Sequence, residues 1–170
     1  MRISTLAFAG LAAAAPSSLV ARKDGRPDYS GTYWDVTIST QSGRPGYSIR
    51  DLTTTFHRAG AEQTVPGSCH YSFVPQGTSA PAVTDRCDKG LTYTWNYTTL
   101  TMRQDVVVGN ETIWFFATPT KIETTRKSDG TGGSSYTGTG RVELHHYCND
   151  HGCSDVDGCV TIECQEGKTN

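Results

Sequence analysis

Several features that would reveal an activity at once are missing from the sequence. No apolar run after the N-terminal segment approaches the roughly 20 residues that a membrane-spanning helix needs. Lys and Arg form no stripe that could neutralise phosphates, and the formal net charge of the 170 residues is -2. The Gly-x-Ser-x-Gly elbow of acyl-transfer enzymes is also absent. We therefore expect neither a membrane protein nor a nucleic-acid-binding protein, and no catalytic motif is evident.

What is present begins with the pattern of a secretory signal. A short positively charged head precedes an apolar run from Ile3 to Ala15, which ends in the small residues that signal peptidase accepts. We expect residues 1–15 to be removed, with a possible pro-segment that extends to residue 22. The exported chain then forms a single domain over residues 23–170, because that length is enough for one hydrophobic core.

Alternating polar and apolar residues indicate β-strands joined by turns. Residues 33–39 show the pattern most clearly, since Trp34, Val36 and Ile38 share one face. A change of phase near Asp51 suggests a bulge or a bend in the next strand. The remaining expected strands cover residues 47–58, 70–74, 91–95, 98–108, 112–117, 120–125, 141–148 and 159–164. We therefore expect an all-β fold, a compact antiparallel β-sandwich or barrel of roughly eight strands stapled by disulfides.

One segment departs from the strand pattern. Residues 127–140 contain five glycines together with several Ser and Thr residues. Such a composition cannot bury enough apolar surface to order itself. We expect a flexible surface loop there, which connects two strands of one sheet.

The cysteines predict disulfide bonds, because the chain has an even number of them and a signal for export. The six are Cys69, Cys87, Cys148, Cys153, Cys159 and Cys164. Cys69 and Cys87 flank a loop rich in Gly, Pro, Ser and Thr and adjoin expected strands, so we expect a bridge between them. The other four then pair among themselves in one of three ways. If the last two strands form a hairpin, the pairs are Cys148–Cys159 and Cys153–Cys164.

The four cysteines of the tail could instead hold a metal ion, because His145, His146 and His151 lie beside them. Their Cys-x4-Cys-x5-Cys-x4-Cys spacing lacks the Cys-x2-Cys knuckles that usually wrap zinc. His145 and His146 could still bind copper or zinc weakly, but as neighbours on a strand they would point to opposite faces. We therefore expect disulfides, no metal site and no cofactor.

Two N-glycosylation sequons agree with export. Asn96-Tyr97-Thr98 and Asn110-Glu111-Thr112 both have the Asn-x-Thr pattern. Gly109-Asn110 also predicts a hairpin turn, where a glycan would be exposed. Asn110 is therefore the better candidate, and Asn96, which lies between aromatic residues, is the poorer one.

Residue types for acid-base catalysis occur without a distinctive spacing. A small secreted ribonuclease needs a Glu and His pair with an Arg for the phosphate. These types are supplied by His57, Arg141, Glu143 and His145, but they occur on any polar surface. We do not expect an enzyme, and we keep a small secreted hydrolase such as a ribonuclease as an alternative function.

Aromatic residues offer a further alternative, a module that binds cell-wall carbohydrate. The three tryptophans fall within alternating strands, where large aromatic side chains most often enter the core. Tyr33 and Tyr97 have the opposite parity and are better candidates for stacking on a sugar ring or a partner protein. Together with His145 and His151 they make up the candidate binding surface.

The order of these elements resembles a known family. The resemblance is carried by Trp34-x-Val36, the stretch from Tyr47 to Phe56, the loop between Cys69 and Cys87, and residues 91–95, 100–106 and 112–118. It is to the small secreted β-barrel proteins of filamentous fungi related to the major Alternaria allergen. The resemblance implies a compact antiparallel β-barrel or sandwich that is exported to the host apoplast or the culture medium. It also implies an effector or elicitor that binds a host plant protein and modulates defence, without enzymatic activity. No cysteine precedes Cys69, so a covalent dimer of the allergen type is not implied.

Overall fold

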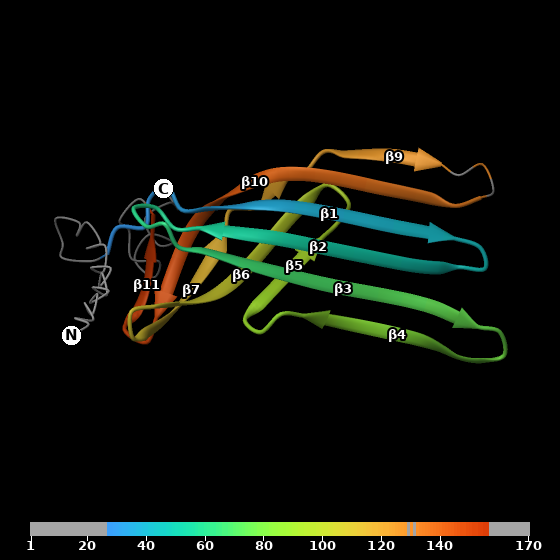
Figure 1. Ribbon diagram of the computed structural model, residues 1–170, viewed down its shortest axis with the longest axis horizontal. Helices are drawn as coiled ribbons and strands as arrows, with labels where there is room; N and C mark the ends of the chain where they lie inside the picture. Colours follow the sequence, from blue (N-terminus) through green and yellow to red (C-terminus); the bar gives the residue numbers. More distant parts are fainter. Residues whose placement is uncertain (1–26, 129, 131, 157–170) are drawn as a thin grey trace, which may run out of the picture.

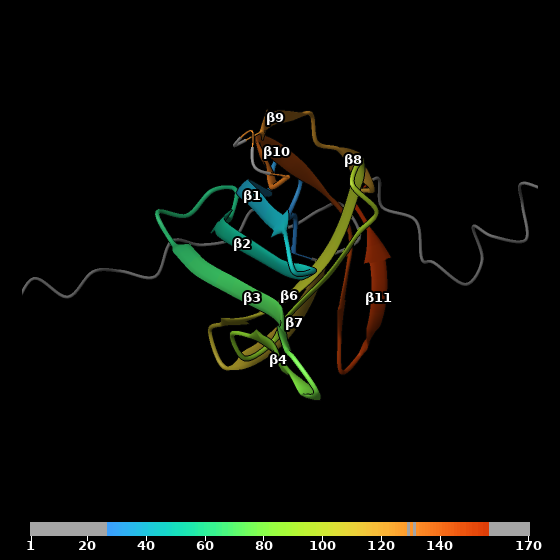
Figure 2. The ribbon, with the colours of Figure 1, turned by 90° about the vertical axis from the view of Figure 1, so that its right-hand side faces the viewer.

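The expected all-β, antiparallel and disulfide-stapled fold is confirmed, and it takes the form of a half-barrel. The computed structural model describes residues 27–128, 130 and 132–156. Its eleven strands form one curled sheet (Figure 2). They are β1 (Tyr33–Gly43), β2 (Tyr47–His57), β3 (Thr64–Gln76), β4 (Ser79–Cys87), β5 (Leu91–Trp95), β6 (Thr99–Val108), β7 (Glu111–Ala117), β8 (Thr120–Lys121), β9 (Thr124–Ser128), β10 (Ser134–Asn149) and β11 (Gly152–Asp155). The described residues form no helix, and hence none that is long and apolar enough to cross a bilayer.

Strand β10 joins the two sides of the sheet. The strand order is β4-β3-β2-β1-β10-β7-β6-β5, while β8 pairs with β6, and β9 and β11 both pair with β10. Residues 134–143 of β10 lie against β1, whereas residues 144–148 lie against β7. In Figure 1, β1 to β4 run side by side along the length of the molecule, and β5, β6 and β7 cross behind them at an angle. The curl of the sheet encloses the core between these two sides.

The core consists of the inward-facing residues of both sides. Trp34, Val36 and Ile38 are all buried, as their alternation predicts. The indole nitrogen of Trp34 donates a hydrogen bond of 2.8 Å to Oε1 of Gln104, which satisfies both buried polar groups. Trp95 is buried as well. The third tryptophan, Trp114, is only half-buried, because β7 turns its even-numbered side chains outward.

The segment between Cys69 and Cys87 is a hairpin. The expected strand over residues 70–74 is confirmed within β3, whereas the prediction of a loop from there to Cys87 is wrong. Strands β3 and β4 pair over most of their length, and the two cysteines are directly opposite each other. Their disulfide is present, which confirms the expected bridge. Strand β4 is an edge strand whose residues are nearly all exposed. It therefore has no buried face to create an alternating pattern.

The prediction of a flexible loop over residues 127–140 is also wrong in its extent. Residues 134–140 belong to β10, and β9 continues to Ser128. Gly138 and Gly140 serve close packing rather than flexibility. A Cβ atom at Gly138 would lie 2.7 Å from the carbonyl oxygen of Glu123, and one at Gly140 would lie 2.9 Å from Cδ1 of Ile122. Ile122 is buried against this part of the sheet, which only glycine leaves open.

The change of phase near Asp51 does not mark a bulge. Strand β2 pairs with β1 and with β3 in unbroken register through this point. Residues 47–51 are all half-buried, whereas the following residues alternate between buried and more exposed positions. The phase change therefore marks the place where β2 leaves the core.

The second disulfide differs from the expected pairs. Cys148 bonds to Cys153 across the β10–β11 hairpin, where the two residues are directly opposite each other. This bond replaces the expected Cys148–Cys159 and Cys153–Cys164 pairs, because the hairpin turns directly after Asn149 and places Cys153 opposite Cys148. Cys159, Cys164 and the expected strand over residues 159–164 lie outside the described residues, as does the expected signal segment. Two disulfides are consistent with an extracellular protein.

Candidate functional site

The outer face of the sheet presents polar side chains in rows across three strands. In β1, Tyr33, Asp35 and Thr37 point away from the core because they alternate with buried residues. The antiparallel registers place outward residues of β2 and β10 beside them. The three rows are His57, Tyr33 and Glu143; Thr55, Asp35 and Arg141; and Thr53, Thr37 and Thr139. We call this surface the outer face.

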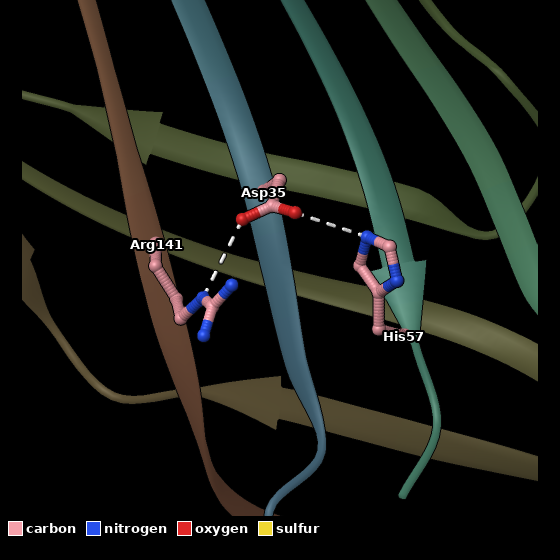
Figure 3. Close-up of polar contacts among 3 residues, drawn as sticks. All are labelled: Asp35, His57 and Arg141. Atoms are coloured by element: carbon pink, nitrogen blue, oxygen red, sulfur yellow. Dashed lines mark hydrogen bonds and ion pairs between the residues drawn. The ribbon is translucent and has the colours of Figure 1, made fainter. Parts of the chain in front are cut away.

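Asp35 links two cationic or potentially cationic side chains on this face (Figure 3). Its Oδ2 atom lies 3.1 Å from Nε2 of His57, and its Oδ1 atom lies 3.5 Å from Nε of Arg141. Strands β2 and β10 lie on opposite sides of β1, so the two partners approach Asp35 from opposite directions. The carboxylate thus uses both oxygens within the sheet.

The same two partners cover the ring of Tyr33. The imidazole of His57 stacks on it with ring centroids 4.6 Å apart, and the guanidinium carbon of Arg141 lies 3.8 Å from the ring centroid. His57 and Arg141 come from strands on either side of Tyr33, so they shield its two faces. We call Tyr33, Asp35, His57 and Arg141 the Asp35 cluster. Tyr33 presents its edge rather than a free face to a ligand.

An open hollow of about 400 Å³ adjoins the Asp35 cluster. Its side chains are mainly hydroxyls, contributed by Thr37, Thr53, Thr55 and Thr139, with Asp35 at its margin. It offers hydrogen-bonding groups on a broad, open surface.

An Asp–His pair recurs further along the outer face. Nδ1 of His70 in β3 lies 2.6 Å from Oδ1 of Asp51 in β2, and Arg86 of β4 is opposite His70. Cross-strand pairs of opposite charge stabilise a wet sheet face. An Asp–His contact on this face therefore indicates a stabilising cross-strand pair and does not by itself indicate catalysis.

A β-bulge brings two histidines together on β10. The register with β7 shifts between Leu144 and His146, which leaves His145 as the extra residue. Side chains at even positions are buried before the bulge, as at Val142, whereas the odd-numbered Tyr147 is buried after it. The two histidines therefore share a side of the sheet, and the expectation that they point to opposite faces is wrong. Their Nδ1 atoms are 3.0 Å apart.

Asp155 completes this second group, which we call the His145 cluster. It is opposite His146 in the β10–β11 pairing, and its Oδ1 atom lies 3.8 Å from Nδ1 of His145. The ring of His146 stacks on Phe116 with centroids 4.3 Å apart. Burial lowers the pKa of His146, as does the adjacent His145, while Asp155 acts in the opposite direction. The neutral form of His146 is thus favoured.

A hollow of about 390 Å³ opens beside the two histidines. Its wall is formed by both imidazoles together with Phe116, Pro119, Thr94 and Thr101, among other residues of β5, β6 and β7. A small molecule in this hollow would reach the histidines and an apolar surface at once.

The aromatic residues of β3 and β5 turn to the inner side of the sheet. The guanidinium of Arg50 lies over the rings of Tyr71 and Trp95, with its central carbon 5.7 Å and 6.0 Å from their centroids. Burial raises the pKa of Tyr93, and a hydrogen bond from Arg50 acts against that rise. The chain's own arginine thus occupies the surface that these rings could have offered to a sugar.

The structure does not bring the candidate binding surface together. Tyr33 lies in β1, and Tyr97 lies in the turn between β5 and β6. Strands β10 and β7 separate β1 from β6 in the sheet. Tyr97 is 58% exposed, has a φ of 72°, and rests against Trp95. His145 belongs to the His145 cluster, whereas His151 is exposed at the β10–β11 turn.

Both sequon asparagines are exposed and lie in turns. Asn110 is in the predicted turn between β6 and β7, where Val108 pairs with Glu111 and Gly109 has a φ of 63°. The side-chain oxygen of Asn96 accepts hydrogen bonds from the backbone of Thr98 and Thr99 and so shapes its own turn. Glycosylation at either residue stays a prediction.

The two aspartates that organise the clusters, Asp35 and Asp155, are not among the candidate site residues predicted from the sequence. Asp35 could have been found, since its outward parity was evident and only the neighbouring strands were unknown. The position of Asp155 beside the two histidines depends on a hairpin and a bulge, and no local sequence pattern predicts either of them.

Comparisons with protein-family models, curated proteins and solved structures find no match for this chain.

Proposed function

We propose that this chain is an exported, non-enzymatic binding protein of the effector or elicitor type. It would act on a host plant protein through the outer face. The observation that supports this most directly is the Asp35 cluster, in which Tyr33 is held between His57 and Arg141. Tyr and Arg contribute a disproportionate share of binding energy at protein interfaces. Side chains that are fixed before binding also lose less conformational entropy when a partner arrives.

The surroundings of the cluster favour a macromolecular partner. Small ligands generally bind in concave, largely apolar pockets, whereas the outer face is broad and lined by threonine hydroxyls. Protein interfaces combine an aromatic and arginine centre with a polar rim. The two disulfides would preserve this surface outside the cell.

Infiltration of the purified chain into leaves tests the proposal, with the reactive-oxygen burst as the defence response. Wild type should alter the response, and Arg141→Ala should abolish most of the effect because it uncovers Tyr33 and releases Asp35. The matched control is Lys121→Ala, which also removes an exposed base paired with a carboxylate, Glu123 at 3.2 Å. Wild-type protein without any effect, or an Arg141→Ala variant as active as wild type, would overturn the proposal.

A ribonuclease-type hydrolase is a second candidate, favoured by one specific observation. His57 and Glu143 flank Tyr33 in a single row, and Arg141 lies in the adjacent row. This arrangement supplies an acid-base pair and a phosphate-binding cation on one face. If it is catalytic, His57→Ala should lower RNA cleavage by about 100-fold or more. His70→Ala is the control, because His70 is also paired with an aspartate on the outer face. Absence of cleavage by the wild-type protein would remove this candidate.

A further inference from the structure

The His145 cluster combines three potential metal ligands from two strands. One donor atom each of His145, His146 and Asp155 can be chosen so that all three lie within 4.8 Å of one another. The side chain of His145 is 52% exposed, so an ion could approach the group past His145, whereas Oδ1 of Asp155 is buried beneath it. None of the three belongs to the Asp35 cluster.

The separation of the two imidazoles matches that of ligands on one ion. Zinc–nitrogen bonds of about 2.0–2.1 Å place two nitrogens about 2.9 Å apart at a right angle and about 3.3 Å apart at the tetrahedral angle. The observed Nδ1–Nδ1 distance of 3.0 Å falls between these values. The rings are nearly perpendicular, at 86°, so the two nitrogens meet without the rings overlapping. The bulge therefore brings together two imidazole nitrogens that a regular strand would separate.

The surrounding structure holds the three side chains in place. Stacking on Phe116 fixes the ring of His146, with an interplanar angle of 11°. The Cys148–Cys153 disulfide closes the hairpin that carries Asp155. Cys148 lies two residues after His146, and Cys153 lies two residues before Asp155, so the bond is close to the His146–Asp155 pair. The 3.8 Å from Asp155 Oδ1 to His145 Nδ1 exceeds the tetrahedral ligand separation by only about 0.5 Å. The three donor atoms lie within 4.8 Å of one another, so the side chains would have to rotate to close around one ion.

The donor set indicates the class of metal. Two imidazole nitrogens and one carboxylate oxygen suit zinc and its transition-metal neighbours, whereas magnesium and calcium prefer oxygen alone. Three protein ligands leave a fourth position for water or another ligand. Both imidazoles line the hollow beside Phe116 and Pro119, so a small molecule bound there could take that position.

We propose that His145, His146 and Asp155 bind a zinc-class divalent ion, with one coordination position accessible from this hollow. The site shares no residue with the Asp35 cluster and does not rest on the function proposed for the outer face. It can therefore be tested separately.

Isothermal titration of the oxidised, full-length protein with Zn²⁺ tests the proposal. The protein should carry no histidine tag, and any free thiol should be blocked with iodoacetamide so that cysteine cannot supply ligands. We expect one ion per chain. His145→Ala, His146→Ala and Asp155→Asn should each weaken binding by about tenfold or more, since even loss of a group behind a ligand typically costs 10–100-fold. The matched control is His151→Ala, which removes an exposed imidazole from the same hairpin and should leave affinity unchanged.

A second measurement does not depend on the variants folding. In the NMR spectrum of the wild-type protein, Zn²⁺ should shift the imidazole signals of His145 and His146 and leave those of His57, His70 and His151 in place. No zinc binding by the wild-type protein would overturn the proposal, as would equal loss of affinity in His151→Ala or shifts confined to the other three histidines.

Discussion

The two halves of strand β10 follow different rules, although they are continuous in sequence. From Ser134 to Glu143 every residue pairs with β1 in unbroken register. From Leu144 onward the partner is β7, and the register shifts at once. In the first half the direction of a side chain follows from the parity of its residue number. In the second half one extra residue reverses that parity.

This difference determines the kind of chemistry that each half presents. The regular half places Arg141 beside Asp35 on the neighbouring strand, where the two opposite charges form an ion pair. The bulged half places two like side chains, His145 and His146, next to each other on one side. A regular strand produces cross-strand complementarity, whereas a bulge can gather ligands from consecutive residues.

The largest expected effect on stability comes from the regular half, where close packing leaves no room for a side chain at Gly138. Gly138→Val should lower the free energy of unfolding by about 3 kcal/mol, since its Cβ would collide with a backbone oxygen that cannot rotate away. Urea denaturation measures the change. The control is Thr139→Val, which places the same side chain on the exposed neighbouring position and should change stability by less than about 0.5 kcal/mol. Equal stability of the two variants would show that the regular half is not constrained in this way.

The next effect separates the two disulfides. Cys148→Ser/Cys153→Ser removes the bridge of the bulged half, and it should lower the free energy of unfolding by about 2 kcal/mol because the bridge closes only a short loop. It should also weaken zinc binding, because Asp155 is no longer held in place. Cys69→Ser/Cys87→Ser, which opens a longer loop, should cost about 3 kcal/mol and leave zinc affinity unchanged. Unfolding and zinc titrations measure both, with mass analysis to confirm that the other cysteines keep their oxidation state. Equal zinc affinity in the two variants would contradict the role given to the hairpin.

Sequence alone predicts the features that depend on alternation in a half-buried strand. It gives the inward set of Trp34, Val36 and Ile38, the outward Tyr33, and the Gly109-Asn110 turn. The bridge between Cys69 and Cys87 also follows, because both residues adjoin strands. In each of these cases the local pattern and the final environment agree.

The remaining features depend on partners that are distant in sequence. Strand β4 has no buried face and hence no pattern, and Gly138 resembles a linker glycine until Ile122 is placed against it. The bulge at His145 arises where β10 changes partner from β1 to β7. No property of the His145-His146 dipeptide reveals that change. The His145 cluster therefore had to be found in three dimensions.

A smaller effect is expected from the ion pair of the regular half. Arg141→Ala should reduce stability by about 0.5–1 kcal/mol, because an exposed salt bridge and a cation–π contact each contribute little. Arg141→Lys should recover part of the loss through its charge, but it lacks the planar group that covers Tyr33. Thermal unfolding compares the two variants. A loss above about 2 kcal/mol for Arg141→Ala would mean that the cluster is a structural element rather than a surface one.

The smallest effect at neutral pH is expected from Tyr29, which packs against Tyr147 and Phe115 on the inner side of the bulged half. Burial raises the pKa of Tyr29 above that of an unfolded tyrosine. The folded state then holds the phenolic proton more tightly, so the stability that depends on it is complete below about pH 10 and is lost as the pH rises through the folded value. Tyr29→Phe should remove part of this alkaline loss. Some should remain, because burial also raises the pKa of Tyr93. Unfolding curves between pH 7 and pH 11 test this, and an unchanged alkaline slope in Tyr29→Phe would show that the bulged half does not shield its inner side from water.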